Sequence, residues 1–295
     1  SNLFLVRTAD DGVVLSSGIS VLLVIGSIWA FVKFIQTISV SIQAERLLSA
    51  LHKEALSVIS EQKDAVESDD VNLVLPRSVH SFEGQAVRAP QTGYIRLFLR
   101  EKQGDHETDF ESVVAVGEFV AKGDLLGFWK GEDAPDIELF EIGEVRSSMQ
   151  DPSFAIEKLS EIALRGISPG INDPNTAIHA IHYIGDILRE LCELPDGDFL
   201  YSNGKSDWRV KRKTLETILF ESLSPMQTYA SKDIFVMGSV FEAIRMSRLQ
   251  AHETLDLTFD EMIDYFEDVI DWESLHSKEQ NYLRNKIGRA KKMTT

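Results

Sequence analysis

The sequence predicts an α+β chain with four successive regions: an N-terminal transmembrane helix, a helical connector, a small β barrel-sandwich-like module and an all-α domain. Three observations support this prediction. An uncharged apolar run opens the chain, short β-rich segments with glycines follow it, and apolar residues recur at helical spacing through the second half. The expected boundaries are residues 1–40, 41–70, 71–143 and 144–295.

Composition narrows the possible partners and chemistry. With 295 residues and 43% apolar content, the chain is long enough to bury a sizeable core. Its single cysteine, Cys192, excludes an internal disulfide and fits a reducing compartment. A net charge of -17 disfavours nucleic acid as a partner, because a polyanion needs a basic face. No cofactor is expected, since the sequence has no glycine-rich phosphate loop.

The first region has the features of a membrane span. Residues 13–32, VVLSSGISVLLVIGSIWAFV, carry no charge, and a helix of about 20 apolar residues matches a hydrocarbon core of ~30 Å. Asp10 and Asp11 come directly before the run, which is unlike the basic start of a secretory signal. Lys33 and Arg46 follow it, so the positive-inside rule puts the rest of the chain in the cytoplasm.

A buried core helix is the alternative, because serines and Gly26 dilute the hydrophobicity of this run. Small residues within a span commonly face another helix. A lone span that begins almost at the first residue therefore suggests that further spans precede it.

The connector continues the helix. Its apolar residues recur at helical spacing: Ile38, Ile42, Leu47, Leu51, Leu56 and Ile59. The polar run KDAVESDD ends it. The apolar seam, together with the membrane anchor, favours a homo-oligomer.

The sequence of the third region, residues 71–143, predicts β-strands. VRAPQTGYIRLFL and VVAVGEFVAKGDLLGFW are β-rich, and Gly117 and Gly123 fall at the offsets of tight hairpins. The pattern resembles the barrel-sandwich module of biotinyl and lipoyl domains and of membrane-fusion adaptor proteins. Carrier domains hold their cofactor on a hairpin lysine, but Lys102 lacks the flanking pattern. A structural or interaction module is therefore expected, without a swinging arm.

A proline-rich connection joins two helices in the fourth region. Asp151 and Pro152 predict the start of the first helix, which is expected to stop at Ser168, before a proline. Asp173 and Pro174 predict the start of the second helix. Two caps and two prolines fix the backbone of this loop more tightly than a surface connection requires.

Two interpretations of the loop stay open. In the structural one, Asn172 and Asp173 satisfy helix amides, and Arg165 pairs with Glu161. In the functional one, the amides at the start of the second helix bind a small anionic ligand. The candidate ligand-binding residues are Arg146, Gln150, Asp151, Arg165, Ser168, Asn172, Asp173 and Thr176.

A metal site is a weaker candidate. His179, His182 and Asp186 share one face of the second helix, at a spacing that can present metal ligands. The alternative is a solvated polar face. Cys192 lies beside Glu190 and Glu193, which raise a thiol pKa and disfavour a nucleophilic role.

Residues 193–207, ELPDGDFLYSNGKSD, have the composition of a loop, and the basic residues Arg209, Lys211, Arg212 and Lys213 come next. Further helices are expected at 232–250, 258–273 and 277–292. The last one ends in a basic tail that either touches anionic lipid or is solvated.

The run RSSMQDPSFAIEKLSEIALRGISPGINDPNTAI, residues 146–178, resembles the signature of a family of predicted bacterial multi-span membrane proteins of unknown function. Members carry an R-A-L-S-P-G-I-N-D-P motif, in which Gly166 replaces the expected alanine. The likeness extends over residues 13–191. It implies the bacterial inner (plasma) membrane, a cytoplasmic soluble part and spans upstream of residue 1, and it implies no activity.

Together these observations predict the membrane-anchored cytoplasmic part of a transport-, channel- or sensor-related homo-oligomer, without enzymatic activity. Its expected partners are the lipid bilayer, further copies of the chain and a small anionic ligand. The alternative is a membrane-proximal hydrolase, whose site would contain Arg165, Asp173, His179 and His182.

Overall fold

The computed structural model describes residues 2–68, 70–75, 84–99, 108–131, 139–252 and 255–291. Helix α1 (Asn2–Glu67) is the longest element, and its side chains are described for residues 20–34 and 44–67. The chain divides into two units, Ser1–Leu47 and Leu48–Thr295.

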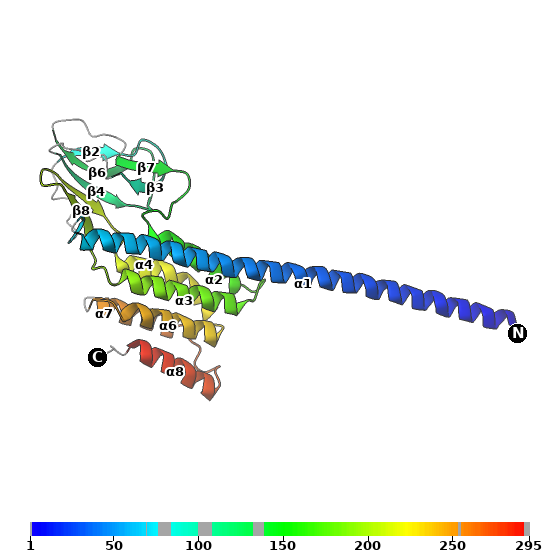
Figure 1. Cartoon of the computed structure of the whole chain (residues 1–295). Helices are drawn as coiled ribbons and strands as arrows, with labels where there is room; N and C mark the ends of the chain where they lie inside the picture. Colours follow the sequence, from blue (N-terminus) through cyan, green and yellow to red (C-terminus); the bar gives the residue numbers. More distant parts are fainter. Residues whose placement is uncertain are drawn as a thin grey trace. The chain divides into compact units, whose positions relative to one another are not determined.

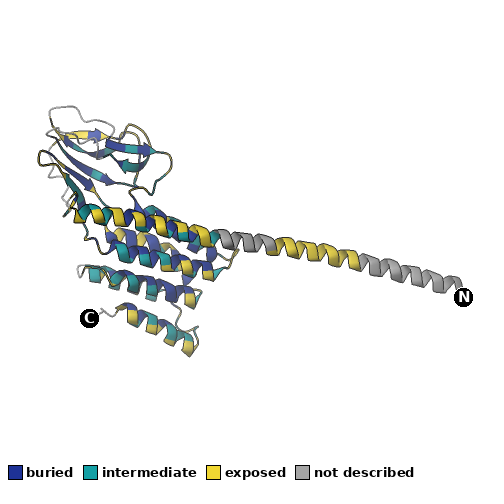
Figure 2. Cartoon of the chain, viewed as in Figure 1, coloured by how far each residue is buried: buried dark blue, intermediate teal, exposed yellow. Residues whose placement is uncertain are grey.

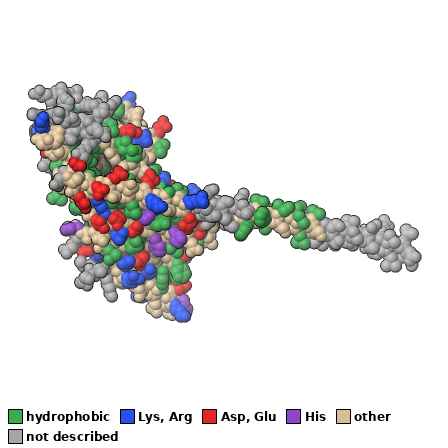
Figure 3. All heavy atoms as spheres, viewed as in Figure 1, with side chains coloured by type: hydrophobic (Ala, Val, Ile, Leu, Met, Phe, Trp, Pro, Cys, Tyr) green, Lys and Arg blue, Asp and Glu red, His purple; other side chains and the backbone are tan. Residues whose placement is uncertain are grey.

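The first unit is helical throughout its described length. Every residue from 20 to 34 is exposed (Figure 2), with Leu22 70% and Trp29 66% accessible. Apolar side chains cover much of this stretch in Figure 3. The span predicted at residues 13–32 lies in this helix, but the side chains of residues 13–19 are outside the described set. Within the described residues, no helix has the length and hydropathy that crossing a bilayer requires. The span stays a prediction.

The second unit mixes sheets with helices, as expected (Figure 1). One sheet has six strands in the order β1-β8-β9-β4-β6-β2, and the other has three in the order β5-β3-β7. All neighbours are antiparallel except β4 and β9. The strands are β1 (Asn72–Val74), β2 (Gln85–Arg88), β3 (Gly93–Phe98), β4 (Asp109–Ala115), β5 (Phe119–Val120), β6 (Leu125–Lys130), β7 (Phe140–Gly143), β8 (Asp198–Ser202) and β9 (Asp207–Lys211). The described strands form no closed barrel.

Strands β8 and β9 correct the expectation of a loop at residues 193–207. They form a hairpin across a turn in which Gly204 has a φ of +79°. Both strands are only five residues long, and the alternation in β9, DWRVK, is confined to that short stretch. Trp208 of β9 is fully buried among aromatic rings, with its centroid 5.7 Å from that of Phe98 and 6.2 Å from that of Phe110. This long-range packing, rather than local propensity, makes the segment a strand.

The second half of the chain is helical around the predicted ranges, although the helix expected at 258–273 ends at Glu267. The helices are α2 (Pro152–Gly166), α3 (Pro174–Leu191), α4 (Leu215–Leu223), the 3₁₀ turn η4 (Ser224–Met226), α5 (Gln227–Ala230), α6 (Ile234–Arg248), α7 (Asp256–Glu267) and α8 (Ser277–Lys291). Helix α3 packs against α2 and α6, and α6 packs against α7 and α8 (Figure 1). Gly185 allows α3 to approach α6 closely, because a Cβ at this position would lie only 2.7 Å from the Cα of Ala243 in α6.

Only the C-terminal part of the predicted connector seam packs within the chain. Leu51 and Ile59 are buried, and Leu56 partly buried, in the same core as residues of α2 and α3, whereas Leu47 is 50% exposed. The side chains of Ile38 and Ile42 lie outside the described residues. Polar contacts reinforce this packing, since Lys63 Nζ lies 2.8 Å from a Glu190 carboxylate oxygen of α3. The buried residues therefore do not present an apolar seam to a second copy, and homo-oligomerisation stays a prediction without that support.

Candidate functional site

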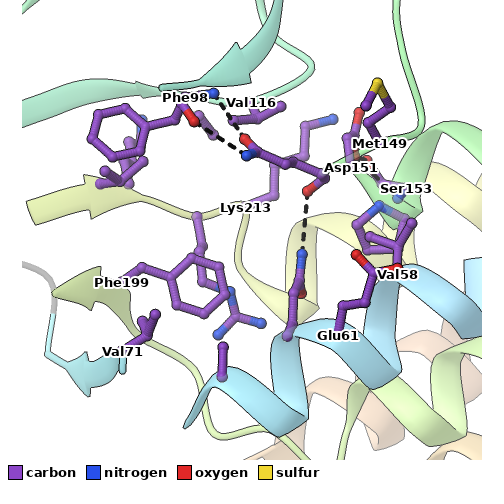
Figure 4. A pocket seen from close by; sticks show the side chains of 18 of the residues that line it. Val58, Glu61, Val71, Phe98, Val116, Met149, Asp151, Ser153, Phe199 and Lys213 are labelled. Atoms are coloured by element: carbon purple, nitrogen blue, oxygen red, sulfur yellow. Dashed lines mark hydrogen bonds between the residues drawn. The ribbon is translucent and has the colours of Figure 1, made fainter. Parts of the chain in front are cut away.

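A cavity of about 340 Å³ lies where the C-terminal turns of α1, both sheets and the start of α2 meet (Figure 4). Its volume is within the range of small-molecule sites, roughly 300–1,000 Å³. Figure 4 shows Phe98 and Val116 on the strand side of the cavity, and Val58 and Glu61 on the α1 side. The cavity therefore joins segments that are far apart in the sequence.

The walls are largely apolar. Phe98, Phe199 and Tyr201 form an aromatic wall, with centroid separations of 5.5 Å between Phe98 and Tyr201 and 6.2 Å between Phe199 and Tyr201. The aliphatic part comes from several segments of the chain. It consists of Val58, Ala65, Val71, Ala115, Val116, Met149, Pro152, Leu191, Val210 and Ile218.

Gln150 fixes one edge of the cavity. Its Oε1 accepts a hydrogen bond of 2.8 Å from the Phe98 amide, and its Nε2 donates one of 3.1 Å to the Phe98 carbonyl. The Gln150 carbonyl accepts a hydrogen bond of 3.2 Å from Gln62 Nε2 on α1 (dashed lines in Figure 4). One residue thus links α1, β3 and the segment that leads into α2.

Arg146 and Asp151 form a buried pair beside this edge. Arg146 Nε donates to Asp151 Oδ2 at 2.7 Å, and the other carboxylate oxygen accepts from the Ser153 amide at 3.1 Å, which caps α2. Arg146 also pairs with Glu157. Asp151 is therefore committed to an ion pair and a helix cap.

Three consecutive cations, Lys211 at the end of β9 and then Arg212 and Lys213, line the cavity. Lys211 donates to the Val113 carbonyl at 3.2 Å, and Lys213 Nζ lies 2.6 Å from a Glu221 carboxylate oxygen. The Arg212 guanidinium lies over the Phe199 ring, 4.7 Å from its centroid. This positive cluster stands in a chain with a net charge of -17.

The proline loop lies at the opposite end of α2. That helix has 15 residues, so its two ends are about 22 Å apart at ~1.5 Å per residue. Asp173 caps α3 by accepting from the Thr176 amide at 3.3 Å and from Thr176 Oγ1 at 2.6 Å. Ser168 donates to the Arg165 carbonyl at 2.7 Å. The structure thus divides the predicted ligand-binding residues: Gln150 and Asp151 line the cavity, and the loop residues do not.

The loop shows one part of the structural interpretation, the cap that Asp173 forms on α3. Asn172 adopts a left-handed φ of +50°, and its amide donates to the Ser168 carbonyl at 2.9 Å. The predicted ion pair between Arg165 and Glu161 does not form. Glu161 instead pairs with Lys158 at 2.7 Å, and Arg165 is exposed. A binding role for the loop residues stays a prediction.

Comparison with known proteins places this site within a family. The profile described as "Predicted membrane protein (DUF2254)" matches residues 1–246. The chain belongs to the DUF2254 family. Similar proteins include the uncharacterized protein Rv1290c of Mycobacterium tuberculosis (strain H37Rv) and the uncharacterized protein Mb1321c of Mycobacterium bovis, each 24% identical over 235 residues. These matches cover 74% of this chain and 45% of each relative, so the chain spans about half the length of the curated relatives. No solved structure matches.

The DUF2254 match covers the cavity and the histidines of α3. His179 and His182 are exposed, and histidines are visible on the face of the helical part in Figure 3. Asp186 accepts from His52 Nε2 at 2.9 Å and pairs with Arg189 at 3.1 Å. Within the described part of the chain, no three His, Cys, Asp or Glu side chains are grouped to hold a metal ion. The predicted metal ligands are therefore not brought together.

Sequence reasoning missed most of the cavity. Phe98, Phe199 and Gln62 come from segments that were interpreted as strand, loop and connector, with no sign that they meet. The basic run at residues 211–213 was a usable signal. Its placement depends on the pairing of β9 with β4, which no local pattern reveals.

Proposed function

We propose that this DUF2254 chain is the membrane-anchored, non-enzymatic ligand-binding region of a bacterial sensor- or transport-related protein, with its soluble part in the cytoplasm. The observation behind the proposal is the 340 Å³ cavity, whose wall includes the C-terminal turns of α1. The same helix contains the apolar stretch near its start.

Membrane attachment is supported by the family description and by the exposed apolar side chains near the start of α1. Large apolar side chains from Val21 to Phe34 are each about half to two-thirds accessible, as in Val32 at 49% and Leu23 at 66%. Leaving such a surface in water costs roughly 25 cal/mol per Å². Contact with lipid removes this cost, and Lys33 and Arg46 on the C-terminal side favour a cytoplasmic location for the remainder of the chain.

A sensing role is supported by the range of segments that line the cavity. A ligand there would contact α1, β3, β8, β9 and the start of α2 at once. Binding would then favour whichever arrangement of these segments holds the ligand best, which is how a ligand shifts a conformational equilibrium. Assembly into homo-oligomers is part of the proposal, and the particle mass of the purified protein tests it.

The hydrolase alternative lacks support. Asp173 is committed to capping α3, Arg165, His179 and His182 are exposed, and none of the four lines the cavity. The remaining nucleophile candidate is inert, since burial and the nearby Asp196 raise the pKa of the Cys192 thiol to about 12.

Native mass spectrometry of the full chain, purified in mild detergent, tests the proposal. Wild type is expected to retain a small molecule, whereas Ala65→Phe is expected to lose it because the ring fills the cavity. Ala50→Phe is the matched control, since Ala50 is an exposed alanine of the same helix. A wild type without bound molecules, or equal occupancy in Ala65→Phe, would refute the proposal.

A further inference from the structure

We infer that the cavity takes an amphipathic anion: an apolar body against the aromatic and aliphatic walls, with one acidic head group held by Arg212 and Lys213. The inference rests on the proposed ligand-binding function. It adds the chemical class of the ligand and the residues that select it.

The apolar body is required by the walls. The side chains of Phe98, Phe199, Tyr201 and Val58 offer few hydrogen-bonding groups, so a strongly polar ligand would lose hydration without compensation. Burying an acyl or aryl group there is favourable in proportion to the apolar area removed from water.

The head group is selected by Arg212. Its guanidinium makes two hydrogen bonds with the described residues, both from Nη1, to the carbonyls of Pro195 (3.2 Å) and Gly197 (3.4 Å). The Nε and Nη2 hydrogens, three of the five guanidinium donors, are left for a ligand. In the described part of the chain no carboxylate lies within ion-pair distance of Arg212, although Asp196 and Asp198 contribute at longer range. A carboxylate or phosphate matches this donor geometry.

Lys213 adds a second positive charge at the same end. Its partner Glu221 is 55% exposed, and a solvent-exposed pair of this kind is weak enough to rearrange. Lys211 is 46% exposed and lies 3.8 Å from Glu118, so it is the least specific of the three.

The two carboxylates of the cavity do not oppose an anion at this end. Asp151 is ion-paired with Arg146, with 2.6 Å between Nη2 and Oδ2, and its other oxygen is occupied by the α2 cap. Glu61 belongs to α1, on the other side of the cavity from the strands (Figure 4). The charges therefore orient the ligand, with its head at β9 and its body towards α1.

Binding of octanoate and octanol to the full chain in phosphatidylcholine nanodiscs tests the inference by isothermal titration calorimetry. Octanoate is expected to bind at least about 10-fold more tightly than octanol, because charge-assisted hydrogen bonds form with the carboxylate alone. Lys213→Gln and Arg212→Gln are each expected to weaken octanoate about 10-fold and to leave octanol unchanged. Lys205→Gln removes an exposed charge from the β8–β9 turn and is the matched control.

Equal binding of octanoate and octanol, or wild-type octanoate affinity in Lys213→Gln, would overturn the inference about the head group. The proposal that the cavity binds a ligand would remain. Inorganic phosphate that binds as tightly as octanoate would also overturn it, because no apolar body would be needed. Failure of both octyl probes to bind wild type would instead refute the proposed function. Arg212→Gln also removes the contact between Arg212 and the Phe199 ring, which can destabilise the fold. If this variant unfolds, the octanoate affinity of folded Lys213→Gln decides whether the inference holds.

Nanodiscs that contain phosphatidylglycerol identify the source of the ligand. Weaker apparent octanoate binding in them means that an anionic lipid occupies the site. Unchanged binding means that a soluble amphipathic anion does. Both outcomes support the same head-group chemistry.

Discussion

Arg146 and Asp151 form a buried ion pair at the start of α2, with the two side chains 9% and 4% exposed. The turn between β4 and β5 packs directly against the pair, because a Cβ at Gly117 would overlap the Asp151 carboxylate. One ion pair thereby joins a β-turn, the segment at the cavity edge and a helix cap. Asp151 and Ser153 at this junction both line the cavity.

Asp151→Ala is expected to lower the free energy of unfolding by about 3 kcal/mol. The change removes the cap of α2 and leaves the Arg146 charge buried with Glu157 as its remaining carboxylate partner. Urea denaturation followed by circular dichroism measures the loss. A change below about 1 kcal/mol, the value of a cap alone, would show that the ion pair contributes nothing.

Gly117→Ala is expected to destabilise the fold more than Gly123→Ala does. Both glycines have a positive φ, +92° and +94°, so both alanines are strained by about 1 kcal/mol or more. Only at position 117 does the added methyl group meet the Arg146–Asp151 pair, whereas position 123 has open space. Melting temperatures of the two variants test the difference. Equal losses would mean that the turn does not press on the ion pair.

Asp173→Ala separates the two interpretations of the proline loop. As a cap, Asp173 contributes about 1 kcal/mol. The variant is therefore expected to melt at a lower temperature while its octanoate affinity stays that of wild type. Lost affinity with an unchanged melting temperature would instead favour a binding site at the loop.

Glu242 gives the helical part an acid-sensitive contact between α6 and α8. Burial acts to raise the pKa of this carboxyl, but hydrogen bonds from Arg245 (2.6 Å) and Lys286 (3.1 Å) outweigh it and hold the pKa below its ordinary value of 4.5. A depressed folded-state pKa contributes stability above pH 4.5, and this stability is lost as the pH falls through the folded-state value.

Glu242→Gln is therefore expected to lower the melting temperature at pH 7 and to flatten its decline under acid conditions. Melting curves of the variant and wild type between pH 7 and pH 3 measure the effect. A constant difference between the two across this range would show that Glu242 is not the titrating group.

The sequence predicted the locally encoded parts of this structure. Asp151 and Asp173, each followed by proline, marked the starts of α2 and α3, and Gly117 and Gly123 marked tight turns, because caps and positive φ values depend on a few adjacent residues. Such signals need no knowledge of distant segments.

The cavity could not be predicted from the sequence, because the segments that line it are far apart in the chain. The hairpin of β8 and β9 joins a sheet formed mostly by residues 72–130, and the Asp207 amide donates to the Asp109 side chain 98 positions earlier. Without that pairing, Arg212 and Lys213 are only a basic run, and Gln150 is only a residue before a cap. The proline loop was predicted as a candidate site because its capping and proline signals are strong. In the structure the side chains of Ser168 and Asp173 form hydrogen bonds with backbone groups.

The most direct test of the central claim is to map where the ligand binds. Octanoate carrying a diazirine near the end of its chain is photo-crosslinked to the full chain in nanodiscs, and the adducts are located by peptide mass spectrometry. Adducts confined to the segments that line the cavity, residues 58–71, 98, 115–116, 149–153, 191 and 199–218, and competed by unlabelled octanoate, are predicted. Adducts concentrated at residues 165–179, or spread evenly over the soluble part, would contradict the assignment of the cavity as the binding site.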